Sequence, residues 1–159
     1  MNADAQFWDG LAEKYAAQPL ENPTAFDRKI ALTRQTMKAT DVVLNVGCGT
    51  GSLCLRLADV GAELHGLDVS GEMVRIAREK ATAQGVTNVT FHTGPFDASF
   101  TTFAPNSLDG VCAFSILHLL AERRAALAQL YSLLKPGGFF VSSTLCIGGS
   151  WIPYSAVLT

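Results

Sequence analysis

The sequence lacks any run of about 18 apolar residues, and it has no strong excess of charge of either sign. Of its 159 residues, 48% are apolar and 16% are charged, and the formal net charge is −2. This composition excludes a disordered or fibrous chain. It predicts one globular domain with a small-molecule partner and no affinity for nucleic acid or membranes. Because the polar N-terminus lacks the apolar segment of a signal peptide, we expect a cytoplasmic location.

Cysteine and histidine are sparse, and neither is clustered. The cysteines include no CxxC pair and no group of histidines completes a zinc site, so we expect free buried thiols and no bound metal. Each histidine lies within or beside an apolar segment, which favours structural roles. The cysteines are Cys48, Cys54, Cys112 and Cys146, and the histidines are His65, His92 and His118.

From Asp41 onward, short apolar runs alternate with helical patterns, and Gly, Asn, Asp or Pro separates them. This alternation predicts an α/β fold with a parallel sheet. The predicted strands are residues 42–46, 63–67, 89–91, 108–114 and 138–145.

Helices are predicted between these strands. Apolar residues repeat at helical spacing over 53–58, and Ser70 can begin a second helix that ends at Gly85. A third helix ends at the Lys-Pro-Gly-Gly sequence of residues 135–138. Its apolar stripe is Leu127, Leu130, Tyr131 and Leu134.

Two further helices precede the sheet, and we expect both to lie across its ligand-binding end. The chain then divides into N-terminal helices over residues 1–40, a core over 41–145 and a tail over 146–159. The two apolar stripes are Phe7, Leu11 and Tyr15, and Phe26, Ile30, Thr33 and Met37.

Glycines at 47, 49 and 51 follow the first predicted strand and precede a helix. Glycine suits a sharp turn that brings bare backbone against a ligand, and open α/β sheets bind nucleotides at this edge. Asp68 ends the second strand, 21 residues after Gly47. Its carboxylate can accept hydrogen bonds from both hydroxyls of a ribose. The sequence therefore predicts a nucleoside site, against the alternative of a purely structural turn.

The glycine spacing also separates nucleotide-binding classes. Ser52 stands where the third glycine of the dinucleotide fingerprint GxGxxG would fall. This departure disfavours a pyrophosphate cradle, and it makes a nicotinamide-dependent oxidoreductase the weaker alternative.

With these motifs, the sequence resembles the class I S-adenosylmethionine-dependent methyltransferases of the ubiquinone and menaquinone branch. The matching segments include VLNVGCGTGSL at 43–53 and LYSLLKPGGFFVSST at 130–144, with two more at 66–81 and 106–120. The resemblance implies a Rossmann-like, open, mostly parallel sheet in the order 3-2-1-4-5, with helices on both faces. It implies S-adenosylmethionine as cofactor, S-adenosylhomocysteine as product, and in-line methyl transfer to a small-molecule acceptor.

The resemblance also assigns residues to parts of the cofactor. The backbone of Gly47, Cys48 and Gly49 would pass beneath the methionyl part, and Asp68 would hold the ribose. The remaining expected contacts are Val69 and Met73 on the adenine, Phe114 and Ser115 at the methyl end, and Tyr15 over the sulfonium.

Two positions depart from the family pattern. Asn45 stands where an acidic residue is usual, so it keeps an acceptor but loses the charge, which would weaken cofactor binding. After the third strand, the usual Gly-Asp-Ala is replaced by a Gly-Pro-Phe-Asp sequence at 94–97. The adenine contact then shifts to Phe96 and Asp97, or disappears. If the acceptor needs a general base, His118 is the candidate, or else a carboxylate of the crossover after the third strand.

Length is a further departure. The family's sheet usually gains two more strands after the fifth, and this sequence has no room for them. The fifth strand would be an exposed edge that pairs with residues 150–159 or with a second chain, giving a homo-oligomer. A non-catalytic or truncated cofactor-binding remnant is therefore the alternative to an active methyltransferase.

Overall fold

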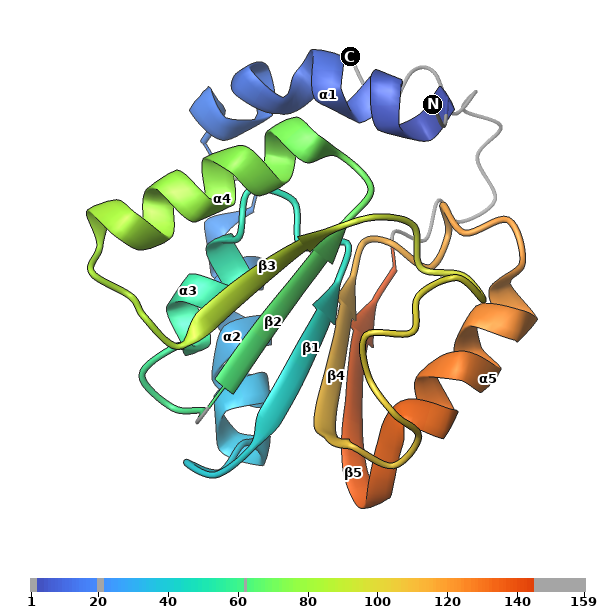
Figure 1. Ribbon diagram of the computed structural model, residues 1–159. Coiled ribbons are helices and arrows are strands. Elements are labelled where there is room, and N and C mark those ends of the chain that lie inside the picture. The colour runs from blue at the N-terminus through green and yellow to red at the C-terminus, as the bar shows by residue number, and fades with distance from the viewer. Residues whose placement is uncertain (1–2, 20–21, 62, 145–159) are drawn as a thin grey trace.

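The computed structural model describes residues 3–19, 22–61 and 63–144. Its described strands form one parallel sheet in the order β3-β2-β1-β4-β5, which confirms the predicted fold (Figure 1). All carboxyl ends of these strands therefore meet at one edge. The strands are β1 (Val42–Val46), β2 (Glu63–Asp68), β3 (Val89–Thr93), β4 (Leu108–Phe114) and β5 (Leu134–Ser143). Cys146 and the predicted tail lie outside the described residues.

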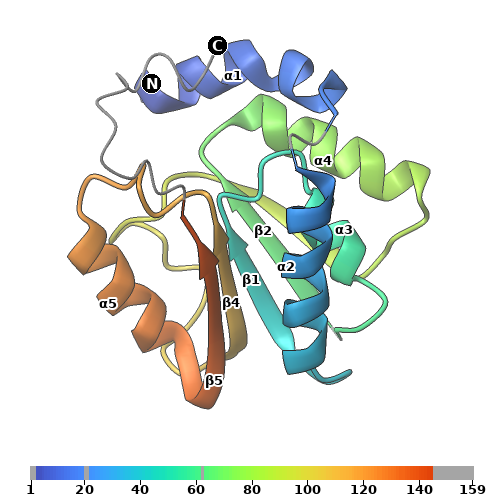
Figure 2. The same ribbon diagram turned by 180° about the vertical axis from the view of Figure 1, so that it is seen from behind.

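Helices cover both faces of the sheet, because successive side chains of a strand point to opposite faces. Val43 of β1 packs with Ile30 of α2 and Leu57 of α3, whereas Leu44 packs with Leu130 of α5 on the other face (Figures 1 and 2). None of the described helices is long and apolar enough to cross a membrane. The helices are α1 (Ala3–Ala17), α2 (Pro23–Thr36), α3 (Ser52–Leu57), α4 (Gly71–Ala83) and α5 (Arg123–Leu133).

Helix α4 begins and ends as the sequence predicts. The Ser70 hydroxyl accepts a hydrogen bond from the Met73 amide at 3.1 Å, which caps the first turn. Gly85 follows the last turn with φ +66°, a left-handed conformation that glycine adopts without strain. The cap places the start of α4 directly after Asp68.

Helix α1 lies across the carboxyl ends of the strands and against α4, as Figure 1 shows. The helix that the stripe of Phe7, Leu11 and Tyr15 predicts is present, but the stripe is not its buried face, since Phe7 is 48% and Tyr15 53% exposed. Ala12 is fully buried instead and packs against Met73 of α4. A small alanine side chain lets α1 pack closely on α4 at this position. The helix therefore buries Ala12 rather than the larger apolar side chains of the stripe.

Helix α2 does not cross the ligand-binding end, contrary to the sequence expectation. It packs beside α3 on a face of the sheet, as the reverse view shows (Figure 2). Its stripe is nevertheless buried as predicted at Ile30, Thr33 and Met37. The stripe therefore predicted a buried face, but not the surface that it meets.

The helix predicted from the stripe of Leu127, Leu130, Tyr131 and Leu134 is present as α5, but the stripe is only partly its buried face, because Leu130 is buried and Leu134 packs against the core. Leu127 is 42% and Tyr131 81% exposed, whereas Ala126, Leu130 and Leu133 are buried. The helix ends at Leu133, and Leu134 is already extended and paired with Leu108. Residues 135–138 form a bulge, and pairing resumes where Phe139 meets Gly110. Leu134 therefore belongs to the strand, and the helical period ends before it.

Two of the histidines are not isolated, contrary to the sequence interpretation. His65 Nδ1 lies 3.1 Å from His92 Nε2, and His65 Nε2 lies 2.9 Å from a carboxylate oxygen of Glu63. Phe103 packs edge-on against the His65 ring. Burial is the main cause that lowers the pKa of both rings. Glu63 opposes this shift at His65, and the positive charges of His65 and Arg78 add to it at His92.

We predict that this pair makes the fold less stable in acid. Because the folded pKa values lie below the usual value of about 6.5, the unfolded chain binds more protons below that pH, and stability falls as pH falls. Urea unfolding at about pH 7.5 and about pH 5.5 should show a larger loss for the parent than for a His65→Gln, His92→Gln double variant. Equal losses in the two proteins would contradict the prediction.

Candidate functional site

The glycine loop between β1 and α3 is tied to the end of β2. The amides of Gly47 and Cys48 both donate to the carbonyl of Leu67, at 2.8 and 3.0 Å. Gly47, Gly49 and Gly51 have φ values of +70°, +52° and +79°, a region that favours glycine. The loop therefore turns sharply while it stays beside the carboxyl end of β2.

The three glycines have different neighbours. A β-carbon on Gly47 would lie 2.7 Å from Ile116, and one on Gly51 would lie 2.8 Å from Phe91, so both positions are closed by the protein. A β-carbon on Gly49 would meet only the Tyr15 ring within 4 Å among the described residues, at 3.8 Å. Gly49 is therefore the glycine whose bare backbone faces the side covered by α1.

Asp68 organises the polar part of the site. One carboxylate oxygen accepts from the Gly49 amide at 2.8 Å, and the other accepts from the Ser70 amide at 3.0 Å. Burial is the main cause that raises the pKa of Asp68, and the negative charge of Asp9 adds to it, whereas the backbone amides oppose it. Because each oxygen can accept another hydrogen bond, the carboxylate suits a ligand with two neighbouring hydroxyls.

Tyr15 comes from α1 and places its ring next to Gly49. Although Tyr15 is 53% exposed as a whole residue, desolvation of its phenol oxygen, and then the negative charge of Asp68, raise the pKa of the phenol. The structure thus brings Tyr15, Gly49 and Asp68 together, although they come from three separate segments.

Other predicted cofactor residues are more deeply packed. Met73 is 2% exposed and lies under Ala12 of α1, so its side chain is part of the α1–α4 contact. The Cys48 thiol lies in the core beside Cys54, and burial raises its pKa well above the ordinary value. The thiol of Cys48 is therefore part of the core packing, and its backbone is the part that forms the glycine loop. Val69 is half-buried beside Asp68.

Asn45 lies on β1 below the loop and is 5% exposed. Its side-chain nitrogen donates to the Cys54 sulfur at 3.8 Å, while its oxygen has no hydrogen-bond partner within the described part of the chain. A buried acceptor without a partner destabilises a fold by about 1–3 kcal/mol. Asn45 thus retains the acceptor that the sequence predicted, while its side-chain nitrogen faces Cys54 of α3.

Phe96 and Asp97 take part in the structure of their own segment. Phe96 is 8% exposed and packs in the core next to Phe100, with ring centroids 5.7 Å apart. The Asp97 carboxylate accepts from the Ser99 amide at 2.8 Å, and the hydrogen bonds from Ser99 lower the pKa of Asp97. Their adenine contact stays a prediction.

The carboxyl end of β4 carries Phe114 and Ser115. The ammonium of Lys29 lies 5.7 Å from the centroid of the half-buried Phe114 ring. Ser115 is exposed and has φ +55°, which is uncommon for a residue with a β-carbon. Such backbone strain is found most often at ligand sites.

Leu117, Leu119 and Leu120 beside His118 are typical of a helix, but the structure places His118 in a turn after β4. It lines a hollow with Leu117, with Arg123 and Leu127 of α5, and with Thr144. Its role as a general base stays a prediction.

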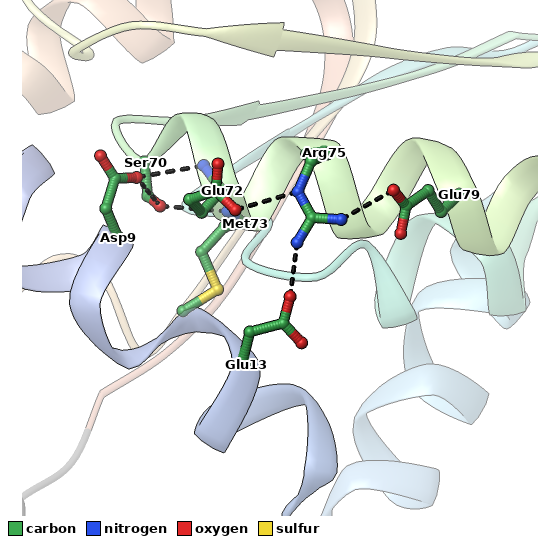
Figure 3. Close-up of polar contacts among 7 residues, drawn as sticks. All are labelled: Asp9, Glu13, Ser70, Glu72, Met73, Arg75 and Glu79. Carbon is green, nitrogen blue, oxygen red and sulfur yellow. Dashed lines mark hydrogen bonds and ion pairs between the residues drawn. The ribbon is translucent and has the colours of Figure 1, made fainter.

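Sequence reasoning missed Asp9. The structure places its carboxylate against Ser70 and the first turn of α4, as Figure 3 shows. Asp9 lies on α1, and no local pattern links it to a partner 61 residues away.

The methyltransferase domain family matches residues 43–138, from β1 to the bulge in β5. The match covers more than half of the chain, so the chain belongs to this family, and the resemblance noted in the sequence is confirmed.

Individual relatives share this core. The demethylmenaquinone methyltransferase of Anoxybacillus flavithermus is 31% identical over 122 residues, which are 72% of this chain and 51% of that protein. The crystal structure of the [4+2]-cyclase SpnF superposes with a TM-score of 0.78 at 27% identity, over 92% of this chain and 62% of that one. A SAM-dependent methyltransferase from Aquifex aeolicus gives 0.63 at 25% identity, over 74% and 64%. This chain spans about half the length of the curated relatives that it matches.

The glycine loop supports a prediction about stability. Gly51→Ala combines a positive φ with a β-carbon 2.8 Å from Phe91, whereas Gly85→Ala has a positive φ and no neighbour within 4 Å. We expect Gly85→Ala to lower the free energy of unfolding by about 1–2 kcal/mol, and Gly51→Ala to lower it by roughly 1–3 kcal/mol more. Denaturant unfolding of both variants measures the difference. An equal loss would mean that packing at Gly51 does not matter.

Proposed function

We propose that this chain binds S-adenosylmethionine at the glycine loop and Asp68, and that it catalyses methyl transfer to a small molecule. The observation that carries the proposal is the group of Tyr15, Gly49 and Asp68, in which bare backbone, a doubly supported carboxylate and an aromatic ring converge. Membership of the methyltransferase domain family supports the same reaction. It also counts against a nicotinamide-dependent oxidoreductase.

The residues present fit this cofactor. Gly49 has room for a ligand because it carries no side chain, and a β-carbon there would occupy the space below the Tyr15 ring. The two Asp68 oxygens, held by backbone amides, match the paired hydroxyls of a ribose. The Asn45 oxygen adds a buried acceptor two residues before the loop.

The protein's contribution to the reaction is orientation and exclusion of water. When bound, S-adenosylmethionine supplies a methyl group on a sulfonium that is already an activated leaving group. Asp68 would fix the nucleoside end, and the loop backbone would hold the methionyl end. The Tyr15 ring, next to Gly49, would cover the site and offer an aromatic face to positive charge.

The acceptor would approach beside Phe114 and Ser115 at the carboxyl end of β4. The strained backbone of Ser115 and the cation over Phe114 support a binding role for this corner. A relative named for demethylmenaquinone favours a small aromatic or quinone-like acceptor. His118 would be the base if the acceptor has to lose a proton.

A second candidate function is cofactor binding without methyl transfer. One similar structure is named as a [4+2]-cyclase rather than as a methyltransferase. Because the same fold can therefore support another function, this structure favours the second candidate. Binding of S-adenosylmethionine without transfer to any acceptor in a panel of quinols, catechols and amines would support this second candidate.

We predict that S-adenosylhomocysteine binds in calorimetry and that Asp68→Ala weakens binding by about tenfold or more, since hydrogen bonds to a charged group contribute about 1.5–3 kcal/mol each. Asp59→Ala is the matched control, because Asp59 is an exposed carboxylate that pairs with Arg34 on α2. The proposal fails if the parent does not bind, or if Asp68→Ala binds as tightly as the parent.

We also propose that the edge of β5 forms a homo-oligomer. In the described sheet, β5 is the last strand, and Phe140 on it is 39% exposed. Light scattering should give a mass above that of one chain, which Phe140→Lys should reduce. Leu32→Lys, at a 53% exposed leucine of α2, should leave the mass unchanged. A parent that stays monomeric as its concentration rises would contradict the proposal.

A further inference from the structure

Helix α1 is attached to α4 by two separate polar contacts, which Figure 3 shows side by side. At the first, one oxygen of Asp9 accepts from the Ser70 hydroxyl at 2.6 Å and from the Glu72 amide at 3.0 Å. At the second, Glu13 pairs with Arg75, which also binds Glu72 and Glu79. Both contacts join the same two helices through a carboxylate of α1.

Only the first contact reaches the site. Ser70 is fully buried, and its amide donates to Asp68 while its hydroxyl donates to Asp9. The same hydroxyl oxygen accepts from the Met73 amide. Ser70 therefore joins Asp9 of α1 to the carboxylate proposed to hold the ribose. The Glu13 contact lies on exposed side chains and meets the first contact only through Arg75 and Glu72, with no hydrogen bond to Ser70 or Asp68 among the described residues.

The position of α1 against α4 also determines where Tyr15 lies. It lies on the same helix as Asp9, and its ring is next to Gly49. When Asp9 holds α1 against the start of α4, Tyr15 is held over the loop. A buried hydroxyl that loses its acceptor destabilises its surroundings, so removing the Asp9 carboxylate affects Ser70 and the loop as well as the helix.

From these contacts we propose that Asp9 is a positioning residue for the nucleoside, which acts through Ser70 to fix the Asp68 loop and couples the seating of α1 to ligand binding. The inference rests on the proposed function. It assigns to α1 a role beyond covering the site, because the helix then sets the geometry of the group that grips the ligand. Coupling of this kind is reciprocal, so the ligand also stabilises the docked helix.

Calorimetry with S-adenosylhomocysteine tests the role of Asp9. Asp9→Ala removes the acceptor, and we expect affinity to fall about five- to tenfold. Asp9→Asn keeps an acceptor oxygen and should restore affinity to within about twofold of the parent. Glu13→Ala, the matched control, removes a carboxylate between the same helices and should also stay within about twofold. Equal losses for Asp9→Ala and Glu13→Ala would overturn the inference, because general loosening of α1 would then explain both.

A double-mutant cycle separates positioning from simple structural support. If Asp9 acts through Asp68, Asp9→Ala should have little further effect on affinity in an Asp68→Ala background. Additive losses would overturn the inference. Hydrogen exchange provides a second readout: ligand should slow exchange of the α1 amides in the parent and much less in Asp9→Ala. If the parent itself does not bind, the proposed function fails. If the parent binds and Asp9→Ala is unchanged, only the role of Asp9 fails.

Discussion

The Leu67 carbonyl is the acceptor on which the arrangement of this site depends. It accepts from two successive amides, those of Gly47 and Cys48, and the next residue of β2 accepts from Gly49. These bonds tie the turn after β1 to the end of β2, which a loop with side chains at positive φ could not follow without strain. Because the β1 and β2 ends are neighbours in the sheet, the fold itself brings loop and carboxylate together.

This arrangement holds Asp68 in partly buried surroundings, where its charge is disfavoured. Burial and the nearby Asp9 raise the pKa of Asp68, and the backbone amides of Ser70, Gly49 and Val69 only partly offset that effect. A ligand with two hydroxyl donors would stabilise the same charge. A raised pKa at a partly buried carboxylate is typical of a functional site.

Local features of the sequence predicted much of this structure. The strands, the glycine turn, the Ser70 cap and the place of Asp68 follow from residues that are near one another in the chain, whereas the strand order was implied by the resemblance to the family. The predictions that failed depend on distant partners: His65 meets His92 27 residues away, and Asp9 meets Ser70 61 residues away. Periodicity also misplaced the buried face of α1 and part of that of α5, because a helix shows its apolar residues but not the surface that will cover them.

Asp9 illustrates why such long-range contacts matter for recognition. Its charge opposes ionisation of Asp68, yet its oxygen completes the hydrogen bonding of a hydroxyl that is fully buried. A neutral acceptor would satisfy Ser70 equally well, so the oxygen of Asp9, rather than its charge, carries the proposed positioning role. In the proposed coupling, seating of α1 and binding of the nucleoside favour each other, so the helix would be part of the binding site rather than a cover over it.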